Sequence, residues 1–237
     1  MNEGRAALEA ALPHLDVIVQ CEADRHRTLL VADMDSTMIT VECIDELADY
    51  VGLKTEVAAI TERAMRGELD FAEALHSRVS LLAGLPEAIV AECLRERVKP
   101  MSGAIALIAA FRAAGGRAIL VSGGFTHFTY SVAAQLGFDR AVANQLGVAD
   151  GTLTGKVLAP IVDGATKRAV LLEELAGRAA TTSVAIGDGA NDIPMIEAAG
   201  LGIAYHAKPI TRAAANAHVR HGDLGVVRYS LGLDRDT

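Results

Sequence analysis

Residues 28–37 read TLLVADMDST, and this stretch decides how the chain folds. Its apolar residues 29–32 follow one another without alternation, which is typical of a parallel strand buried on both faces. The strand ends at Asp33 and Asp35, and ligands of open parallel sheets bind beyond the carboxyl ends of the strands. The two acids are therefore candidate catalytic groups, although an isolated Asp-x-Asp pair is more often a polar turn.

Outward from this strand, helical and strand patterns alternate. Helices are expected at 103–114, 125–136 and 166–176, with strands at 117–121, 183–186 and, as the last core strand, about 201–204. Residues 140–158 alternate around an Asp-Gly pair, which predicts a short strand and a β-hairpin. The alternation predicts an α/β fold, namely a Rossmann-like, doubly wound parallel sheet with right-handed crossovers.

The same patterns divide the chain into three parts. Residues 1–27 form a lead-in segment with a short amphipathic piece at 6–12 and no visible chemistry. Residues 28–40 and 100–237 form the α/β core. Helical spacing continues from about 41 to 98, which predicts a helical cap at 41–99, inserted after the first strand and lying over the carboxyl edge of the sheet.

Composition limits the possible functions. The chain has 237 residues, 51% of them hydrophobic, and a net charge of −8. A core of good size is expected, and general nucleic-acid binding is not, because it needs a basic face. Three widely spaced cysteines argue against disulfides or structural zinc. Without a signal peptide or an apolar run long enough for a bilayer, we expect a cytoplasmic protein with no membrane partner. Its oligomeric state is not readable.

Three predicted strands end in unusual polar residues. Asp33 and Asp35 follow the first, Ser122 and Gly123 follow the second, and Asp188 follows the third, with Asn191 and Asp192 close behind it. The carboxyl ends of parallel strands share one edge, so these distant segments are expected to converge.

Each group suggests its own chemistry. Asp33, Asp35 and Asp188 offer oxygen ligands to a hard divalent ion, and Mg²⁺ suits a site with few carboxylates, waters and a phosphate. Ser122 and the amides after it can donate to a phosphate oxygen, and Gly123 lets the ligand approach the backbone; the alternative is a polar loop.

Lys167 stands at the start of a predicted helix, where a cation is unfavourable because the helix dipole is positive there. This position suggests an anionic partner, and a solvated surface lysine is the ordinary alternative. His218 and His221 have no nearby Cys or acidic ligand in the sequence and are expected at the surface.

Together the motifs at Asp33-Met-Asp35-Ser-Thr, Ser122-Gly-Gly, Lys167 and Gly187-Asp188-Gly-Ala-Asn191-Asp192 resemble the four ordered motifs of the haloacid dehalogenase superfamily of phosphatases. Within the cap, Glu42, residues 64–71 and residues 78–82 resemble the phosphoserine phosphatase family. The resemblance covers roughly residues 29–227.

The resemblance implies a role for each core residue. Asp33 would attack phosphorus and become an aspartyl-phosphate, while Asp35 would protonate the leaving oxygen, later activate water, and offer the metal its backbone carbonyl. Lys167, Ser122 and Mg²⁺ would stabilise the phosphoryl oxygens. Asn191 would help to place the phosphate or the nucleophile, and Asp192 would support Lys167 or a metal-bound water.

Substrate choice is expected to come from the cap. Arg78 lies seven residues after Phe71, only about 20° away on a helical wheel, so its charge falls within an apolar stripe and needs a partner. The resemblance implies a substrate carboxylate; a buried structural salt bridge is the alternative. It also assigns Glu42 to a substrate ammonium, where stabilisation of a helix start is equally natural. Met65 and Phe71 would close the pocket or belong to the cap core.

The resemblance therefore implies a Mg²⁺-dependent phosphatase that hydrolyses O-phospho-L-serine in the final step of serine biosynthesis. One alternative is a phosphatase for another small phosphomonoester. A second is a phosphate-accepting signalling domain, although such a domain needs neither a cap nor Asp35. A third is a non-catalytic ligand-binding relative, against which the presence of every expected catalytic side chain argues.

Overall fold

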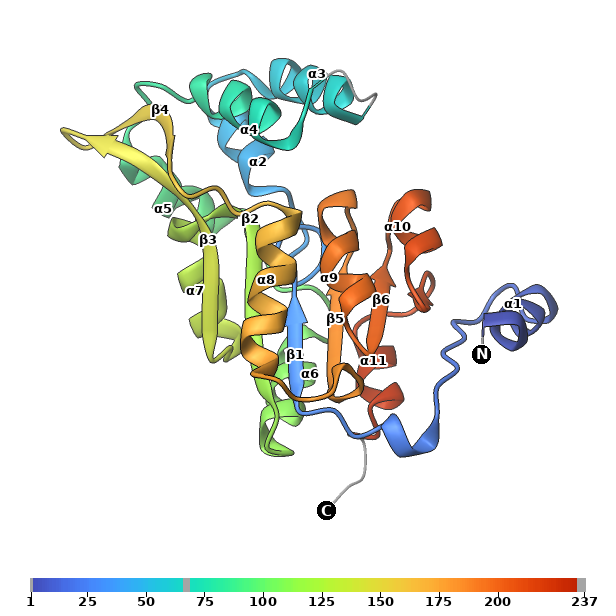
Figure 1. Cartoon of the computed structure of the whole chain (residues 1–237). Helices are drawn as coiled ribbons and strands as arrows, with labels where there is room; N and C mark the ends of the chain where they lie inside the picture. Colours follow the sequence, from blue (N-terminus) through green and yellow to red (C-terminus); the bar gives the residue numbers. More distant parts are fainter. Residues whose placement is uncertain (1, 66–68, 234–237) are drawn as a thin grey trace.

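The computed structural model describes residues 2–65 and 69–233, and its centre is a seven-stranded sheet (Figure 1). The strand order is β4-β3-β2-β1-β5-β6-β7. The strands are β1 Leu29–Ala32, β2 Arg117–Phe125, β3 Arg140–Ala149, β4 Thr152–Leu158, β5 Ser183–Gly187, β6 Leu201–Tyr205 and β7 Ala217–Val219. Only β4 runs antiparallel to its neighbour, β3. The predicted doubly wound α/β fold and its hairpin are thus confirmed.

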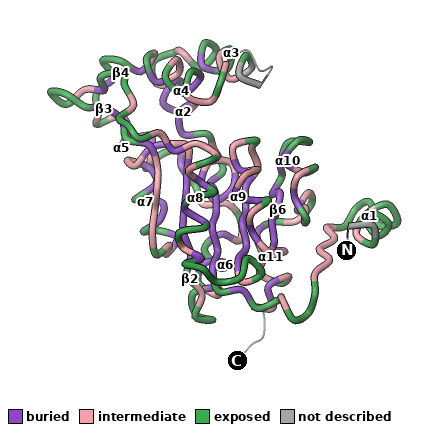
Figure 2. The backbone as a smooth tube through the Cα atoms, in the orientation of Figure 1, coloured by how far each residue is buried: buried purple, intermediate pink, exposed green. Residues whose placement is uncertain are grey.

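Helices cover both faces of this sheet, which explains why β1 is apolar without alternation. Leu30 and Ala32 pack in one cluster with helices α6 (Ala104–Ala113), α7 (Thr126–Leu136) and α11 (Gly225–Ser230). Leu29 and Val31 pack in the other, against α8 (Gly164–Leu175) and α9 (Ile193–Ala198), which α10 (Pro209–Ala214) adjoins. The central strands are accordingly the most continuously buried part of the chain (Figure 2).

In the described part of the inserted segment, four helices lie beyond the carboxyl ends of the strands (Figure 1). They are α2 Cys43–Tyr50, α3 Lys54–Met65, α4 Phe71–Ser80 and α5 Glu87–Glu96. Asp70 starts α4 with a capping box, because its carboxylate accepts from the Glu73 amide at 2.7 Å and the Glu73 side chain accepts from the Asp70 amide at 3.0 Å. The long stretch of helical spacing in the sequence therefore corresponds to several short helices, each with its own start and end.

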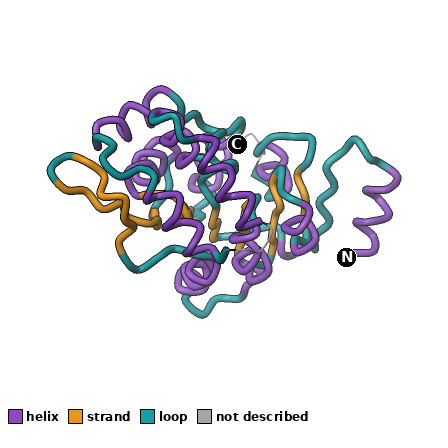
Figure 3. Tube along the Cα trace, turned by 90° about the horizontal axis from the view of Figure 1, so that it is seen from above, coloured by secondary structure: helices purple, strands orange, loops and turns teal. Residues whose placement is uncertain are grey.

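The hairpin of β3 and β4 reaches up to these cap helices and projects to one side when the molecule is seen from above (Figure 3). The Gly84 amide donates to the Leu153 carbonyl, and the Leu153 amide donates to the Leu85 carbonyl, both at 2.8 Å. Leu146 and Leu153 join the apolar cluster that contains the cap residues. The hairpin therefore links the core sheet to the cap.

The first 27 residues contain α1 (Asn2–Ala11) and a 3₁₀ turn at Glu22–Asp24. Polar contacts tie this segment to the core. Asp16 accepts hydrogen bonds from the amides of residues 220–222, and the buried Arg27 donates to the Ser183 carbonyl at 3.1 Å. None of the described helices combines the length and apolar character that a membrane crossing requires.

Three expectations differ from the structure. The strand at 201–204 is not the last, because β7 adds three residues at the sheet edge, too few for a pattern to stand out. The helix expected from Phe125 starts at Thr126, since β2 continues to Phe125. His218 is not a surface residue: its ring is half-buried between Arg5 and Glu9, whereas His221 is exposed as expected.

Candidate active site

Asp33 follows β1 directly, and its amide donates to the Ile186 carbonyl of β5 at 2.9 Å. Its Oδ1 lies 2.5 Å from Lys167 Nζ, and the same ammonium lies 2.7 Å from Asp192 Oδ1. All three side chains are buried, with Lys167 fully inaccessible. The anionic partners that the position of Lys167 suggested are thus two carboxylates, and the alternative of a solvated lysine is wrong.

This buried charge cluster shifts the pKa values of Lys167 and Asp33. Burial disfavours the Lys167 ammonium, but the carboxylates of Asp192 and Asp33 outweigh it, so the pKa of Lys167 is raised and the side chain stays protonated. The pKa of Asp33 is raised by burial and by the charge of Asp192, against the opposing effect of Lys167. One ammonium therefore does not neutralise the carboxylates around it.

Carboxylate oxygens of Asp33, Asp188 and Asp192 lie within 4.8 Å of one another. Asp192 is already engaged, because Oδ1 contacts Lys167 and Oδ2 accepts from the amides of Asp188 and Gly189 at 3.1 and 3.0 Å. Gly187 makes this possible, since a Cβ there would lie 2.4 Å from Asp192 Cγ. Both oxygens of Asp192 are therefore engaged, so Asp33 and Asp188 are the candidates to share a metal ion.

The donor set fits a hard divalent cation. Burial and the charge of Asp192 raise the pKa of Asp188 to about 7, and Thr37 Oγ1 donates to Asp188 Oδ1 at 3.2 Å. Three clustered carboxylates and one ammonium leave excess negative charge, which a cation with oxygen ligands would neutralise. The carboxylate of Asp35 is not in this group; its expected contribution is its backbone carbonyl.

The carboxyl group of Asp35 is held from two sides. Its Oδ1 accepts from the Cys43 amide, at the start of α2, at 3.0 Å, and its Oδ2 accepts from Ser122 Oγ at 3.3 Å. Burial and the nearby charge of Glu42 raise its pKa to about 6. A Cβ on Gly124 would lie 2.7 Å from Asp35 Oδ2, so this approach requires glycine. A carboxyl group in this state can both give and take a proton near neutral pH.

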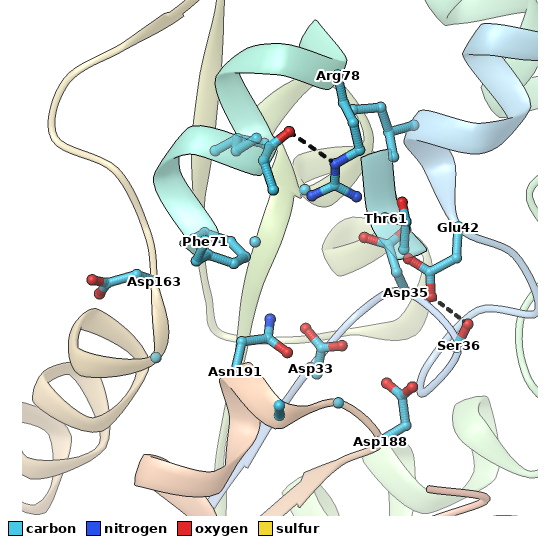
Figure 4. A pocket seen from close by; sticks show the side chains of 18 of the residues that line it. Asp33, Asp35, Ser36, Glu42, Thr61, Phe71, Arg78, Asp163, Asp188 and Asn191 are labelled. Atoms are coloured by element: carbon cyan, nitrogen blue, oxygen red, sulfur yellow. Dashed lines mark hydrogen bonds between the residues drawn. The ribbon is translucent and has the colours of Figure 1, made fainter. Parts of the chain in front are cut away.

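Beyond these groups opens a cavity of about 760 Å³ between core and cap (Figure 4). Asp33, Asp188 and Asn191 line it from the sheet edge, and Arg78 faces them from α4. The side is lined by Asp35, Ser36, Glu42, Phe71 and Gly123. Asp33 and Asn191 are 158 positions apart in the sequence and thus meet at one site, as the edge rule for parallel strands predicts.

Arg78 is half-buried, and its Nε donates to the Ala74 carbonyl at 3.2 Å. Burial lowers its pKa, against the effects of Asp45 and Glu42. Among the described residues no carboxylate lies within 4.0 Å of the guanidinium, so the structural salt bridge is not found there. The remaining guanidinium N–H groups are directed at the cavity (Figure 4).

The other cap predictions have mixed outcomes. Glu42 is exposed, precedes α2 and makes no capping hydrogen bond; its Oε1 accepts from Ser36 Oγ at 2.6 Å. The ring of Phe71 reaches the sheet edge, where a Cβ on Gly123 would lie 3.1 Å from its Cζ. Met65 ends α3, and its side chain lies outside the described residues.

Sequence reasoning missed Lys208, which lines the cavity and follows the carboxyl end of β6. Its amide donates to the Asp188 carbonyl at 3.2 Å, and its charge opposes the rise in the pKa of Asp188. The rule that located Asp33, Ser122 and Asp188 at strand ends, applied to β6 as well, would have found it.

Several known proteins are similar to this chain. Residues 30–197 match the family model described as haloacid dehalogenase-like hydrolase. The chain is 50% identical over 203 residues to a phosphoserine phosphatase of Albidiferax ferrireducens, covering 83% of this chain and 86% of that protein. It is 45% identical to one of Streptomyces coelicolor, covering 97% of this chain but 57% of that protein.

The structure of this chain is also similar to a solved structure. A probable phosphoserine phosphatase from Vibrio cholerae, in unliganded form, superposes with a TM-score of 0.82 at 42% identity. The match covers 96% of this chain and 71% of that one.

Proposed function

The chain belongs to the haloacid dehalogenase-like hydrolases, and from this premise we propose that it is a phosphatase that hydrolyses O-phospho-L-serine to L-serine and phosphate. The observation that carries the proposal is the pairing of two features across one cavity. Asp33, in contact with Lys167, lies on the sheet side, and the N–H groups of Arg78 that are directed at the cavity lie on the cap side. A small molecule with both a phosphate and a carboxylate would use both.

In the first step, the Asp33 oxygen not bonded to Lys167 attacks phosphorus, and the bond from phosphorus to the serine oxygen breaks. Asp35, with its raised pKa, gives its proton to the departing oxygen. Lys167 donates to the phosphoryl oxygens as charge moves to the leaving group, and the Ser122 hydroxyl, which donates to Asp35 Oδ2 in the free protein, would turn its proton toward a phosphoryl oxygen. The product of this step is a phosphoryl group on Asp33 and free serine.

In the second step, the ionised Asp35 takes a proton from a water molecule. The resulting hydroxide attacks phosphorus and the bond to Asp33 breaks, which restores both acids and releases phosphate. Asp35 therefore acts as an acid and then as a base, and a pKa near neutrality suits both tasks.

The cation is proposed to be Mg²⁺, held by the carboxylates of Asp33 and Asp188 and the backbone carbonyl of Asp35. When bound, it would neutralise the excess negative charge and so allow a phosphate dianion to approach. The chain's own contribution is to keep these oxygens together through Asp192, which fixes Lys167 and the backbone at Asp188.

The cap is proposed to select the amino acid. The guanidinium of Arg78 would bind the carboxylate of phosphoserine in a bidentate manner, and Glu42 would bind its ammonium group. Phe71 would limit the room for a longer side chain. With this substrate, the reaction would be the last step of serine biosynthesis in the cytoplasm.

A phosphate-release screen tests the proposal. The enzyme is offered phosphoserine, phosphothreonine and phosphoethanolamine, each with Mg²⁺, with Ca²⁺ and with chelator. We expect turnover of phosphoserine with Mg²⁺ only, and far less turnover of phosphoethanolamine, which lacks the carboxylate. Equal turnover of phosphoserine and phosphoethanolamine would contradict the role of Arg78, and undiminished turnover with chelator would contradict the role of the metal.

A further inference from the structure

Asn144, in β3, is a fully buried polar residue that does not line the cavity. Its Nδ2 donates to the Gly123 carbonyl at 2.8 Å, and its Oδ1 accepts from the Val162 amide at 2.7 Å. A carbonyl only accepts and an amide N–H only donates, so these partners fix the orientation of the side-chain amide. Asn144 thus connects two loops that are 39 positions apart in the sequence, at Gly123 and Val162.

The first loop is a bulge at the end of β2. Val121 is paired with Val142 and Phe125 with Asn144, so residues 122–124 of β2 lie opposite residue 143 alone. A bulge of this kind removes backbone groups from the ladder, and a buried carbonyl without a partner is costly. The side chain of Asn144 supplies the missing donor for Gly123, next to the hydroxyl of Ser122.

The second loop leads into α8. Val162 precedes Asp163, whose carboxylate caps this helix by accepting from the Thr166 amide at 2.8 Å. Lys167 follows within the first turn, and its ammonium contacts Asp33. The position of the Val162 amide therefore sets where α8 begins and, through it, where Lys167 Nζ lies.

We infer that Asn144 is a positioning residue for phosphoryl transfer: it fixes the distance between the Ser122–Gly124 bulge and Lys167, the two donor groups that must hold the same phosphoryl oxygens. The inference rests on the proposed function. Asn144 acts through these groups and touches neither the substrate nor the metal. Because donors to a transferring group lose effect when they are displaced by about 1 Å, loss of the link is expected to cost up to about 10²-fold in rate.

Among side chains of this size, only Asn makes both bonds without taking up a proton. Asn144→Asp keeps an acceptor for Val162 but, when ionised, turns an oxygen toward the Gly123 carbonyl. Asn144→Leu keeps the volume and leaves the Gly123 carbonyl and the Val162 amide without partners. Ionised Asn144→Asp therefore removes one of the two hydrogen bonds, and Asn144→Leu removes both.

The control is Ser183→Ala. Ser183 is also fully buried, and its Oγ donates to the Ala180 carbonyl at 2.7 Å and accepts from the Gly200 amide at 3.2 Å. It starts β5, at the sheet edge opposite the site. This variant loses a comparable pair of buried hydrogen bonds with no connection to the phosphoryl donors.

The test measures kcat and KM for phosphoserine, inhibition by orthovanadate, which adopts the geometry of a transferring phosphoryl group, and inhibition by L-serine. All assays use the full chain with Mg²⁺, well below each variant's unfolding temperature. For both Asn144 variants we expect kcat/KM and vanadate affinity to fall together by roughly 10- to 100-fold, mainly through kcat, while L-serine inhibition stays within about threefold. Ser183→Ala should be less stable but kinetically normal.

Unchanged vanadate affinity in a folded Asn144 variant would overturn the inference. So would equal weakening of vanadate and L-serine, because that pattern indicates general loss of structure. If Asn144→Leu does not fold, Asn144→Asp decides alone. If the wild-type enzyme proves inactive on phosphoserine, the proposed function fails, and the vanadate comparison still tests the role of Asn144.

Discussion

At Asp35, the environment of one carboxyl group links the cap to the chemistry. Its pKa of about 6 results first from burial and then from the charge of Glu42, while the Cys43 amide opposes the rise. Glu42 belongs to the cap and also raises the pKa of Asp188. The residue proposed to bind the substrate ammonium therefore also influences the proton-transfer group.

Replacing Glu42 by Gln should lower the pKa of Asp35, because the variant removes a negative charge that disfavours the ionised carboxyl. The measurement is an NMR titration of the carboxyl carbons of the metal-free protein. We expect a wild-type pKa of about 6 for Asp35 and a lower value in the variant. Glu96→Gln, on the far end of α5, is the control and should leave it unchanged; an unaltered Asp35 in Glu42→Gln would refute the coupling.

Arg78→Ala should change substrate choice more than catalysis. An Arg–carboxylate hydrogen-bonded pair contributes about 1.5–3 kcal/mol, so kcat/KM for phosphoserine should fall roughly 10- to 100-fold. Turnover of phosphoethanolamine should hardly change, because it has no carboxylate to lose. Arg95→Ala, at the exposed surface of α5, serves as the matched control. Equal losses with both substrates would place Arg78 outside substrate recognition.

At the residue scale, the sequence identified the site residues that directly follow a predicted strand. Asp33, Ser122 and Asp188 follow strands, and parallel strands end at one edge, so their convergence was predictable. Asn144 was not, because it lies within a strand and acts through a bulge whose register no sequence pattern reveals. The engagement of both Asp192 oxygens likewise depends on local backbone geometry.

Among the elements, the N-terminal segment is the least expected contributor. It contains no catalytic motif, yet the Asp16 carboxylate accepts from three successive amides after β7. Hydrogen bonds to the amides of Arg220 and Gly222 lower the pKa of Asp16 despite the opposing effect of burial. The segment is thereby attached to the loop that follows β7, a strand too short to be predicted.

Asp16→Asn should lower the free energy of unfolding near neutral pH and make it less dependent on pH. A folded-state pKa below the unfolded value stabilises the protein above the unfolded pKa of about 3.9, and this contribution is lost as pH falls through the folded pKa. We expect the free energy of unfolding to fall by about 1 kcal/mol at pH 7, and by less below pH 4. Urea unfolding at both pH values measures it; an equal loss at both would rule out the charge as the cause.

For elements, the sequence predicted the strand–helix alternation because apolar periodicity and glycine signals are local. The sequence patterns placed the hairpin at 140–158 in the core and the helices at 41–99 in the cap, with no sign that the two are in contact. In the structure these two pack together through Gly84, Leu85 and Leu153, and backbone pairing between distant segments leaves no periodic signal.

At the scale of the whole molecule, the buried acids of the site lower the stability of the metal-free protein. The pKa of Asp188 is raised to about 7, so its ionised form destabilises the metal-free fold. The sign follows from linkage: an acid with a raised folded pKa costs stability progressively as pH rises above its unfolded value of about 3.9. A bound cation should reverse this cost, because it binds the folded state alone.

Asp188→Asn should therefore be more stable than the wild-type protein without metal at pH 8. Addition of Mg²⁺ should raise the unfolding temperature of the wild type and have little effect on the variant. Calorimetry with and without Mg²⁺ measures both quantities, and Asp150→Asn at the hairpin tip is the control. A wild-type unfolding temperature that does not respond to Mg²⁺ would argue against a metal site at these acids.

The most direct measurement is to stop the reaction with acid during turnover of phosphoserine, reduce the protein with borohydride, and locate the modified residue by peptide mass spectrometry. Reduction of an aspartyl-phosphate yields homoserine. We expect homoserine at position 33 in the wild-type enzyme and none in Asp33→Asn, which should also lack phosphate release. Rapid phosphate release with an unmodified Asp33, or modification of any other residue, would contradict the account.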